Sequence, residues 1–294
     1  MMKEIIPNLI GGSADLAPSN KTYMDGVGDF SKENPAGRNI HFGVRELAMG
    51  AIGNGIMLHG GLRSYVATFF VFSDYIKPMA RLSSIMRIPV TYIFSHDSIG
   101  VGEDGPTHEP IEQLAMLRAM PNMHVFRPCD AVETEAAWYS ALTSKETPTT
   151  IVVTRQNLTP MQGSSKNALK GGYILEDCEG VPDIILIATG SEVELAVEVS
   201  RVLENKGRGV RVVSMPCMDM FEEQSEEYKQ SILPKAVTRR IAIEALSTFG
   251  WGRYVGPEGK IIGMTSFGAS GAYKELFKHF GFTADEIVKI ADNL

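Results

Sequence analysis

Short apolar runs alternate with helical patterns along the chain, and this alternation limits the fold more than any other feature of the sequence. In the first half, apolar runs typical of buried strands occupy 88–94, 123–126 and 149–153, and helical patterns occupy 110–120 and 131–142. Such alternation predicts a parallel sheet that is flanked by helices. We therefore expect the first half to form an α/β domain.

A second unit follows a stretch that is rich in Gly, Ser, Pro and Asn. The apolar run 183–188 leads through Thr189-Gly190-Ser191 into a helical pattern over 192–205 and a further strand at 210–213, which completes a βαβ unit. The 294 residues also suit two domains, at a prior of roughly 150 residues each. We predict two domains, each a mostly parallel sheet flanked by helices, at 1–158 and 183–294, joined by a linker at 159–182.

Composition excludes several classes of protein. The formal net charge of −7 repels a nucleic-acid backbone, so no nucleic-acid partner is expected. Cys129, Cys178 and Cys217 lie far apart and form no C-x-x-C pair, which suits a reducing cytosol. No apolar run approaches the roughly 18 residues that a membrane span needs. The sequence therefore predicts a soluble cytoplasmic chain without membrane contact.

The densest group of polar residues lies at 95–110, called here the polar loop. It follows a buried-type strand and precedes a helical pattern, where open α/β sheets bind their ligands. Its glycines match G-x-G-x-x-G, the motif of dinucleotide-binding turns. However, Glu103 and Asp104 stand where a pyrophosphate needs bare N–H groups, and Pro106 removes a donor. This argues against dinucleotide binding.

Two other interpretations of the polar loop stay open. A metal site is chemically possible, although the spacing of its ligands does not fit a helical histidine pair. Its ligands would be His96, Asp97, Asp104 and His108. The second interpretation is an ordinary loop whose glycines form turns. Four ionisable groups in one short segment favour a functional role over an ordinary loop.

Two further features combine an ordinary structural interpretation with a functional one. Phe69, Phe72 and Tyr75 recur at i, i+3 and i+6 in a helical pattern that runs to Met86, so they form either core packing or a wall that stacks on a flat heterocycle. Glu46 enters a run of small and apolar residues. It is either a first-turn glutamate favoured by the helix dipole or, if buried, a neutral carboxyl that donates a hydrogen bond.

Together these segments resemble the pyrimidine-binding and C-terminal domains of the transketolase family, the thiamine-diphosphate enzymes of the pentose phosphate pathway. The run in the polar loop is highly specific, whereas G-x-R-E recurs across thiamine enzymes. The second half resembles the family's C-terminal domain from its start, I-A-T-G-S-E-V. The matching runs are GGSADLAPSN (11–20), HFGVRELAMGA (41–51), F-x-x-F-x-x-Y (69–75), HDSIGVGEDGPTHEP (96–110) and RQN (155–157).

The resemblance implies a role for each matching side chain. Glu46 would hydrogen-bond the ring nitrogen N1′ of the cofactor's aminopyrimidine and favour its imino tautomer, and the aromatic residues 69, 72 and 75 would pack on that ring. Asp104 would bind the C2 hydroxyl of a ketose, and His108 the reacting end of the sugar. Ser19, His96 and Arg155 match positions that bind the substrate phosphate.

The resemblance also implies a missing part. Nothing in the sequence resembles the Gly-Asp-Gly motif that binds the metal, Mg²⁺ or Ca²⁺, with the diphosphate on the family's N-terminal domain. We therefore expect a transketolase C-terminal half that is inactive alone, has an N-terminal half as partner, and assembles as a homodimer or heterotetramer that binds sugar phosphates. The alternatives are the β subunit of a 2-oxo acid dehydrogenase, against which the polar loop argues, and a catalytically silent binding module.

Overall fold

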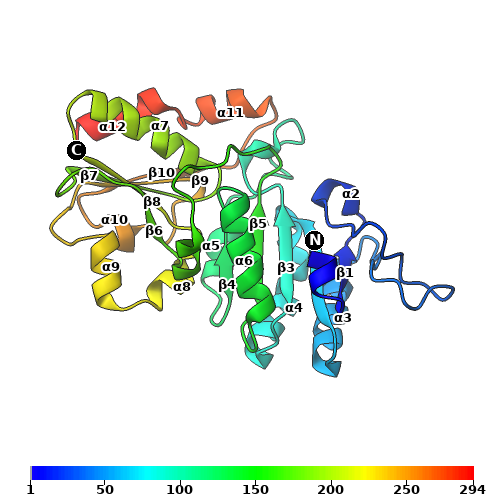
Figure 1. Ribbon diagram of the computed structural model, residues 1–294. Coiled ribbons are helices and arrows are strands. Elements are labelled where there is room, and N and C mark those ends of the chain that lie inside the picture. Colours follow the sequence, from blue (N-terminus) through cyan, green and yellow to red (C-terminus); the bar gives the residue numbers. More distant parts are fainter. Residues whose placement is uncertain (1) are drawn as a thin grey trace.

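The structure is a computed structural model that describes residues 2–294, and it consists of two α/β domains lying side by side (Figure 1). Each domain has a mostly parallel sheet with helices on both of its faces. The fold class predicted from the sequence is thereby confirmed.

The first domain is built on a sheet with strand order β1-β2-β3-β5-β4, in which every neighbouring pair is parallel. Its strands are β1 (Leu9–Ser13), β2 (Arg63–Phe69), β3 (Thr91–Ser95), β4 (His124–Phe126) and β5 (Thr149–Val153). Val66 and Phe94 face one helical layer, whereas Tyr65 and Ile93 face the other, because side chains alternate along a strand. Since the strands are parallel, all of their carboxyl ends lie along one edge of the sheet.

Helices cover both faces of this first sheet. Met49, Ile76 and Leu114 bring α3, α4 and α5 onto one face, and Trp138 brings α6 onto the other. Asp130 caps the start of α6, where its carboxylate accepts hydrogen bonds from two backbone N–H groups. The helices of this domain are α1 (Met2–Ile5), α2 (Ala17–Asn20), α3 (Glu46–His59), η1 (Phe70–Phe72), α4 (Ser73–Met86), η2 (Ile99–Val101), α5 (Gln113–Arg118) and α6 (Ala131–Thr143).

The second domain repeats this layered plan. Its sheet has the order β10-β9-β7-β8-β6, with β6 as an antiparallel edge strand. The strands are β6 (Tyr173–Glu176), β7 (Ile184–Ala188), β8 (Val210–Ser214), β9 (Arg240–Ser247) and β10 (Lys260–Met264). Helices α7, α11 and α12 cover one face, and α8, α9 and α10 cover the other (Figure 1). These helices are α7 (Glu192–Asn205), α8 (Met218–Glu222), α9 (Glu226–Ile232), α10 (Gly252–Val255), α11 (Tyr273–His279) and α12 (Ala284–Asp292). None of the helices described within residues 2–294 has the length and apolar character that a membrane span requires.

The segment 159–182, expected to be a linker, contains regular structure. A 3₁₀ helix, η3 (Lys166–Lys170), is followed by β6, which pairs with β8. Between them, Gly171 takes a φ of 84°, and a Cβ there would lie 2.2 Å from the backbone nitrogen of Phe221. The chain therefore joins the second sheet before residue 183, because the turn at Gly171 delivers it to the edge of β8.

Candidate functional site

The carboxyl edge of the first sheet gathers every segment in which the sequence predicts a site residue. Ser19 lies in α2 after β1, the polar loop begins at the last residue of β3, and Arg155 follows β5. The aromatic residues begin at the last residue of β2. Glu46 opens α3, which leads back toward the start of β2, so the amino end of α3 reaches the same edge.

Glu46 is held close to the end of β2. The hydroxyl of Thr68 donates a hydrogen bond to its Oε1 over 3.4 Å, and the residue is 8% exposed. It is also the first residue of α3, so the structural interpretation and the functional one apply to the same side chain. A carboxyl group largely shielded from water at this edge is able to share a proton with a ligand that enters the site.

Phe69, Phe72 and Tyr75 form a row, with ring centroids 6.1 Å and 6.0 Å apart. The prediction that all three belong to one helical pattern is wrong, because Phe69 ends β2, Phe72 lies in η1 and only Tyr75 lies in α4. The turn between strand and helix therefore spaces the rings. Phe69 stacks on His96 with centroids 3.7 Å apart, and Phe72 meets His108 edge-on at 5.7 Å. The row thus contacts the polar loop at two points.

His96 is fixed by a chain of hydrogen bonds that crosses the sheet edge. Its Nδ1 lies 2.7 Å from the hydroxyl of Ser95, which donates to Oδ1 of Asn20 over 2.6 Å. Burial, the largest cause, and the positive charge of Arg155 together lower the pKa of His96 to about 4, against an opposing effect of the Asp104 carboxylate. The backbone of His96 is left-handed, with a φ of 64°, which is uncommon outside functional sites and turns. His96 is therefore a neutral, oriented imidazole at neutral pH.

The far part of the polar loop is more open. Asp104 is exposed and His108 is half-buried, with Nδ1 of His108 3.0 Å from the hydroxyl of Thr107. Gly102 and Gly105 take φ values of 86° and 77°, a region that glycine adopts without strain. Two of the three glycines of the apparent dinucleotide motif therefore serve the turns of this loop.

Ser19 and Arg155 are exposed at the edges of the site. Ser19 is adjacent to Asn20, whose amide joins α2 to the end of β3 through Ser95. The positive charge of Arg155 contributes to the lowered pKa of His96. A phosphate held there would meet the positive charge of Arg155 and the polar side chains of Ser19 and His96.

The alternative metal site in the polar loop is not formed. Asp97, one of its four proposed ligands, is 1% exposed and accepts a hydrogen bond from Nε of Arg127 over 2.8 Å. Within residues 2–294 no group of three or more His, Cys, Asp or Glu side chains is placed to hold a metal ion. The donor set at the site, one carboxyl beside a row of aromatic rings, fits the pyrimidine ring of thiamine diphosphate better than its diphosphate.

Sequence reasoning missed several side chains that support the site. Asn20 and Ser95 orient His96, and Thr68 contacts Glu46. Arg127 holds Asp97 from the end of β4. A signal for Arg127 was present, because polar residues just after a strand of a parallel sheet lie at the ligand edge.

Comparison with known proteins identifies the family of both domains. Residues 1–161 match the family model of the transketolase pyrimidine-binding domain, and residues 171–283 match that of the transketolase-like C-terminal domain. The transketolase of Staphylococcus epidermidis is 56% identical over 292 residues, which are 98% of this chain and 44% of that protein. The chain thus spans less than half the length of the curated relatives that it matches.

Solved transketolase structures also match this chain over nearly its whole length. A Pichia stipitis transketolase in complex with xylulose 5-phosphate is 47% identical, has a TM-score of 0.95, and is matched over 99% of this chain and 44% of that one. A split-gene transketolase chain, solved as an inactive β4 tetramer, has a TM-score of 0.79 at 23% identity and is covered to 93% of its length. At that identity the likeness shows the fold alone, but it extends over nearly the whole of both chains.

Proposed function

Because the chain belongs to the transketolase family, we propose that it supplies the pyrimidine-binding and C-terminal domains of an enzyme that transfers a two-carbon ketol unit from a ketose phosphate to an aldose phosphate. The observation that carries the proposal is the meeting of a shielded carboxyl, an aromatic row and an imidazole at one sheet edge. Glu46 contacts Thr68, the neighbour of Phe69, and the row continues through Phe72 to His108.

The family implies thiamine diphosphate as the cofactor, and this chain fits one end of it. When bound, the cofactor supplies the electron-accepting centre that lets a carbon–carbon bond beside a carbonyl break and form. Glu46 would hold the proton shared with ring nitrogen N1′, while Phe69, Phe72 and Tyr75 pack on the ring and exclude water. A low local dielectric strengthens that hydrogen bond. The diphosphate, with Mg²⁺ or Ca²⁺, would be bound by an N-terminal portion.

The polar loop and its neighbours would bind the sugar phosphate. Asp104 would accept a hydrogen bond from the ketose hydroxyl, and His108 would orient the reacting end. Arg155 would provide the planar cation for the phosphate, with Ser19 and His96 completing its hydrogen bonds. Because the Ser95 hydroxyl donates to Asn20, it accepts from Nδ1 of His96, and Nε2 is the atom that faces the substrate. Nε2 would donate to the phosphate once the negative charge of the bound phosphate favours the protonated imidazole over the neutral one that burial maintains.

Assembly with other chains is part of the proposal. Apolar side chains on the outer faces of α3 and α4 are exposed, among them Leu47 at 51%, Tyr75 at 62% and Ile85 at 59%. Exposed apolar patches of this kind mark interfaces. We expect the N-terminal portion and a second copy to cover them, in a homodimer or heterotetramer that works in the cytoplasmic pentose phosphate pathway. We propose the limits 1–158 and 183–294 for the two domains, with β6 of the intervening segment added to the second domain because it pairs with β8.

Reconstitution tests the function. The chain is mixed with xylulose 5-phosphate, ribose 5-phosphate, thiamine diphosphate and magnesium, with and without a transketolase N-terminal portion, and sedoheptulose 7-phosphate is measured. Product is expected only with both portions. In that mixture Glu46→Ala should lower kcat by about 10²- to 10⁴-fold, the range for a lost proton-handling side chain.

Glu226→Ala is the matched control, because Glu226 is also the first residue of a helix but lies in the second domain. It should leave kcat unchanged. Full activity of the Glu46 variant would remove this carboxyl from the mechanism. An inactive wild-type mixture that still binds thiamine diphosphate would favour the silent binding module instead.

A further inference from the structure

We propose that the second domain fixes the polar loop in its substrate-binding conformation, and that Arg127 is the positioning residue that transmits this hold. The proposal rests on the function proposed above, because it assigns the polar loop to substrate. It gives the second domain a part in the site, although the predicted site residues all lie in the first domain.

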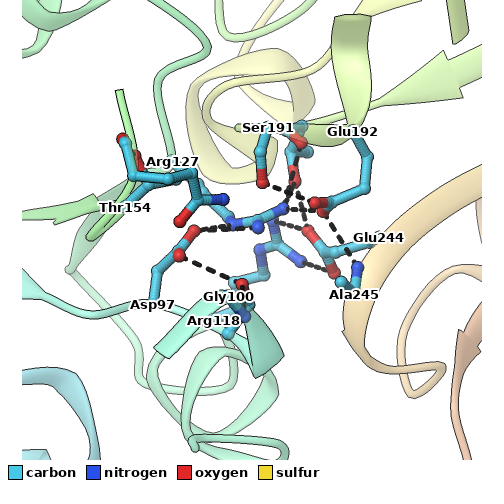
Figure 2. Close-up of polar contacts among 12 residues, drawn as sticks. Asp97, Gly100, Arg118, Arg127, Thr154, Ser191, Glu192, Glu244 and Ala245 are labelled. Atoms are coloured by element: carbon cyan, nitrogen blue, oxygen red, sulfur yellow. Dashed lines mark hydrogen bonds and ion pairs between the residues drawn. The ribbon is translucent and has the colours of Figure 1, made fainter. Parts of the chain in front are cut away.

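Arg127 connects the two domains at a site that is buried from solvent. Its Nε donates to Oδ2 of Asp97 over 2.8 Å, and its Nη1 donates to the carboxylate of Glu192, the first residue of α7 (Figure 2). All three side chains are at most 1% exposed. The carbonyl and hydroxyl of Thr189 accept from Nη1 over 3.0 Å and 2.9 Å. One guanidinium thus binds a residue of the polar loop and the start of a helix in the second domain.

The second domain also fixes the main chain of Arg127. The N–H of Gly190 donates to the carbonyl of Arg127 over 3.1 Å, and the N–H of Arg127 donates to the carbonyl of Pro216 over 2.8 Å. A Cβ at Gly190 would lie 2.7 Å from the guanidinium carbon, so glycine permits this close approach. Backbone and side chain of Arg127 therefore cannot shift without the second domain.

Charge keeps this arrangement intact. Burial alone would lower the pKa of Arg127, but Glu192 and Asp97 more than offset burial, and the pKa is raised. The guanidinium therefore stays charged, and each of its carboxylate partners would be a buried unpaired charge without it. Removing one partner of such a pair is strongly destabilising, because it leaves the other charge buried without compensation.

A short path of hydrogen bonds runs from Asp97 into the polar loop. The hydroxyl of Ser98 donates to Oδ1 of Asp97 over 3.2 Å and accepts from the N–H of Gly100 over 3.2 Å, which caps η2. Beyond η2, the hydroxyl of Ser270 in the second domain donates to the carbonyl of Glu103 over 2.7 Å. The second domain therefore holds the loop on both sides of η2, and the second contact is next to Asp104.

The test compares two buried glutamates that both connect the domains. Glu192→Gln removes the charge that faces Arg127. Glu133→Gln is the matched control, since Glu133 is also fully buried and accepts from Tyr173 and Ser214 of the second domain, but has no contact with the polar loop. Amide hydrogen exchange of residues 98–105 is measured in the full chain. KM and kcat for xylulose 5-phosphate are measured in the mixture of this chain with the N-terminal portion.

Glu192→Gln should speed exchange in the loop about tenfold and raise KM by a similar factor, with a smaller change in kcat, because a weakened buried hydrogen bond opens the loop more often. Glu133→Gln should do neither. Ser270→Ala should have a weaker effect of the same kind, and Ser231→Ala, which removes another exposed hydroxyl bonded over 2.7 Å to a carbonyl, should have none.

If amide hydrogen exchange in residues 98–105 is equally fast in the Glu192 and Glu133 variants, the proposal is overturned, whether or not activity changes. Faster exchange confined to the Glu192 and Ser270 variants, with unchanged KM, would overturn the role in substrate binding. If the wild-type mixture makes no product, the proposed function fails while hydrogen exchange still decides whether the second domain holds the loop.

Discussion

The two sheets use their carboxyl edges in opposite ways. At the first sheet the edge is open, with Asp104 and Arg155 exposed beside an aromatic row. At the second sheet the corresponding edge is filled. Glu192 opens α7 after β7, Glu244 lies near the end of β9, and both are at most 1% exposed.

Arginines of the first domain neutralise the filled edge. Arg118 donates to both oxygens of Glu244 over 2.9 Å, and Arg127 binds Glu192 (Figure 2). Thr189 and Trp251 also donate to Glu244, over 2.6 Å and 2.8 Å. The position where open α/β sheets bind ligands is thus occupied in the second domain by the neighbouring domain. The same layered architecture thus leaves an open edge in one domain and forms a docking edge in the other.

Breaking the docking edge should have the largest effect. We expect Arg127→Met to lower the free energy of unfolding by about 3–5 kcal/mol, because Asp97 and Glu192 would be buried without a counter-charge. Arg87→Met should lower it by less than about 1 kcal/mol, because Arg87 and Glu146 form an exposed pair. Urea unfolding at pH 7 measures both. Similar losses in the two variants would mean that burial does not distinguish the pairs.

The polar loop should show its own pH dependence. Glu109 is 2% exposed, and burial raises its pKa to about 7, against a smaller opposing effect of the N–H groups of Ala269 and Gly102. Its contribution to stability is present below pH ~4.5, the value for the unfolded chain, and is lost as the pH rises through about 7. Glu109→Gln should therefore recover about 1–2 kcal/mol at pH 8.

Thermal unfolding between pH 4 and 8 checks this, with Glu103→Gln, an exposed glutamate of the same loop, as control. The contribution of His96 to stability depends on pH in the opposite direction. Its pKa is lowered to about 4, so its contribution is present above pH 6.5 and lost as the pH falls through about 4. An unchanged profile in the Glu109 variant would show that this carboxyl ionises freely in the folded chain.

The smallest effect should come from the open edge itself. Tyr75→Ala should change the stability of the chain by less than about 0.5 kcal/mol, because the ring is 62% exposed. In the two-portion mixture it should weaken thiamine diphosphate binding about 2- to 10-fold through loss of an aromatic contact. Tyr139→Ala, which removes a ring that is 59% exposed on α6, should leave binding unchanged. Calorimetric titration with the cofactor separates the two variants.

Local patterns predicted much of the fold. The helix expected at 192–205 is α7, and the strand expected at 149–153 is β5. Strands β1 and β2 were not predicted. The first contains Gly11 and Gly12 and lacks a continuous apolar run, and the second ends in Phe69, which looked like the start of a helix. In both cases pairing with neighbouring strands outweighs the local pattern.

The site was predictable only in part. Residues within distinctive runs, such as Glu46 and His108, could be named from the sequence. The partners of Asp97 could not, because Arg127 lies 30 residues away and Glu192 lies 65 residues beyond Arg127. From the sequence alone, a metal ligand was one of the interpretations open for Asp97. Only the docking of the two domains shows that it is one member of a buried charge cluster.

The burial of Arg127 also limits how the molecule can move. Domains of one chain often rotate about a hinge when their interface is small and polar. Here such a rotation would pull Asp97 away from Glu192 and expose the guanidinium between them, which is 0% exposed in the closed arrangement. Bending between the domains is therefore unavailable as a way to admit a ligand. A ligand would then enter and leave past the exposed stretch around Asp104, or past the exposed faces of α3 and α4.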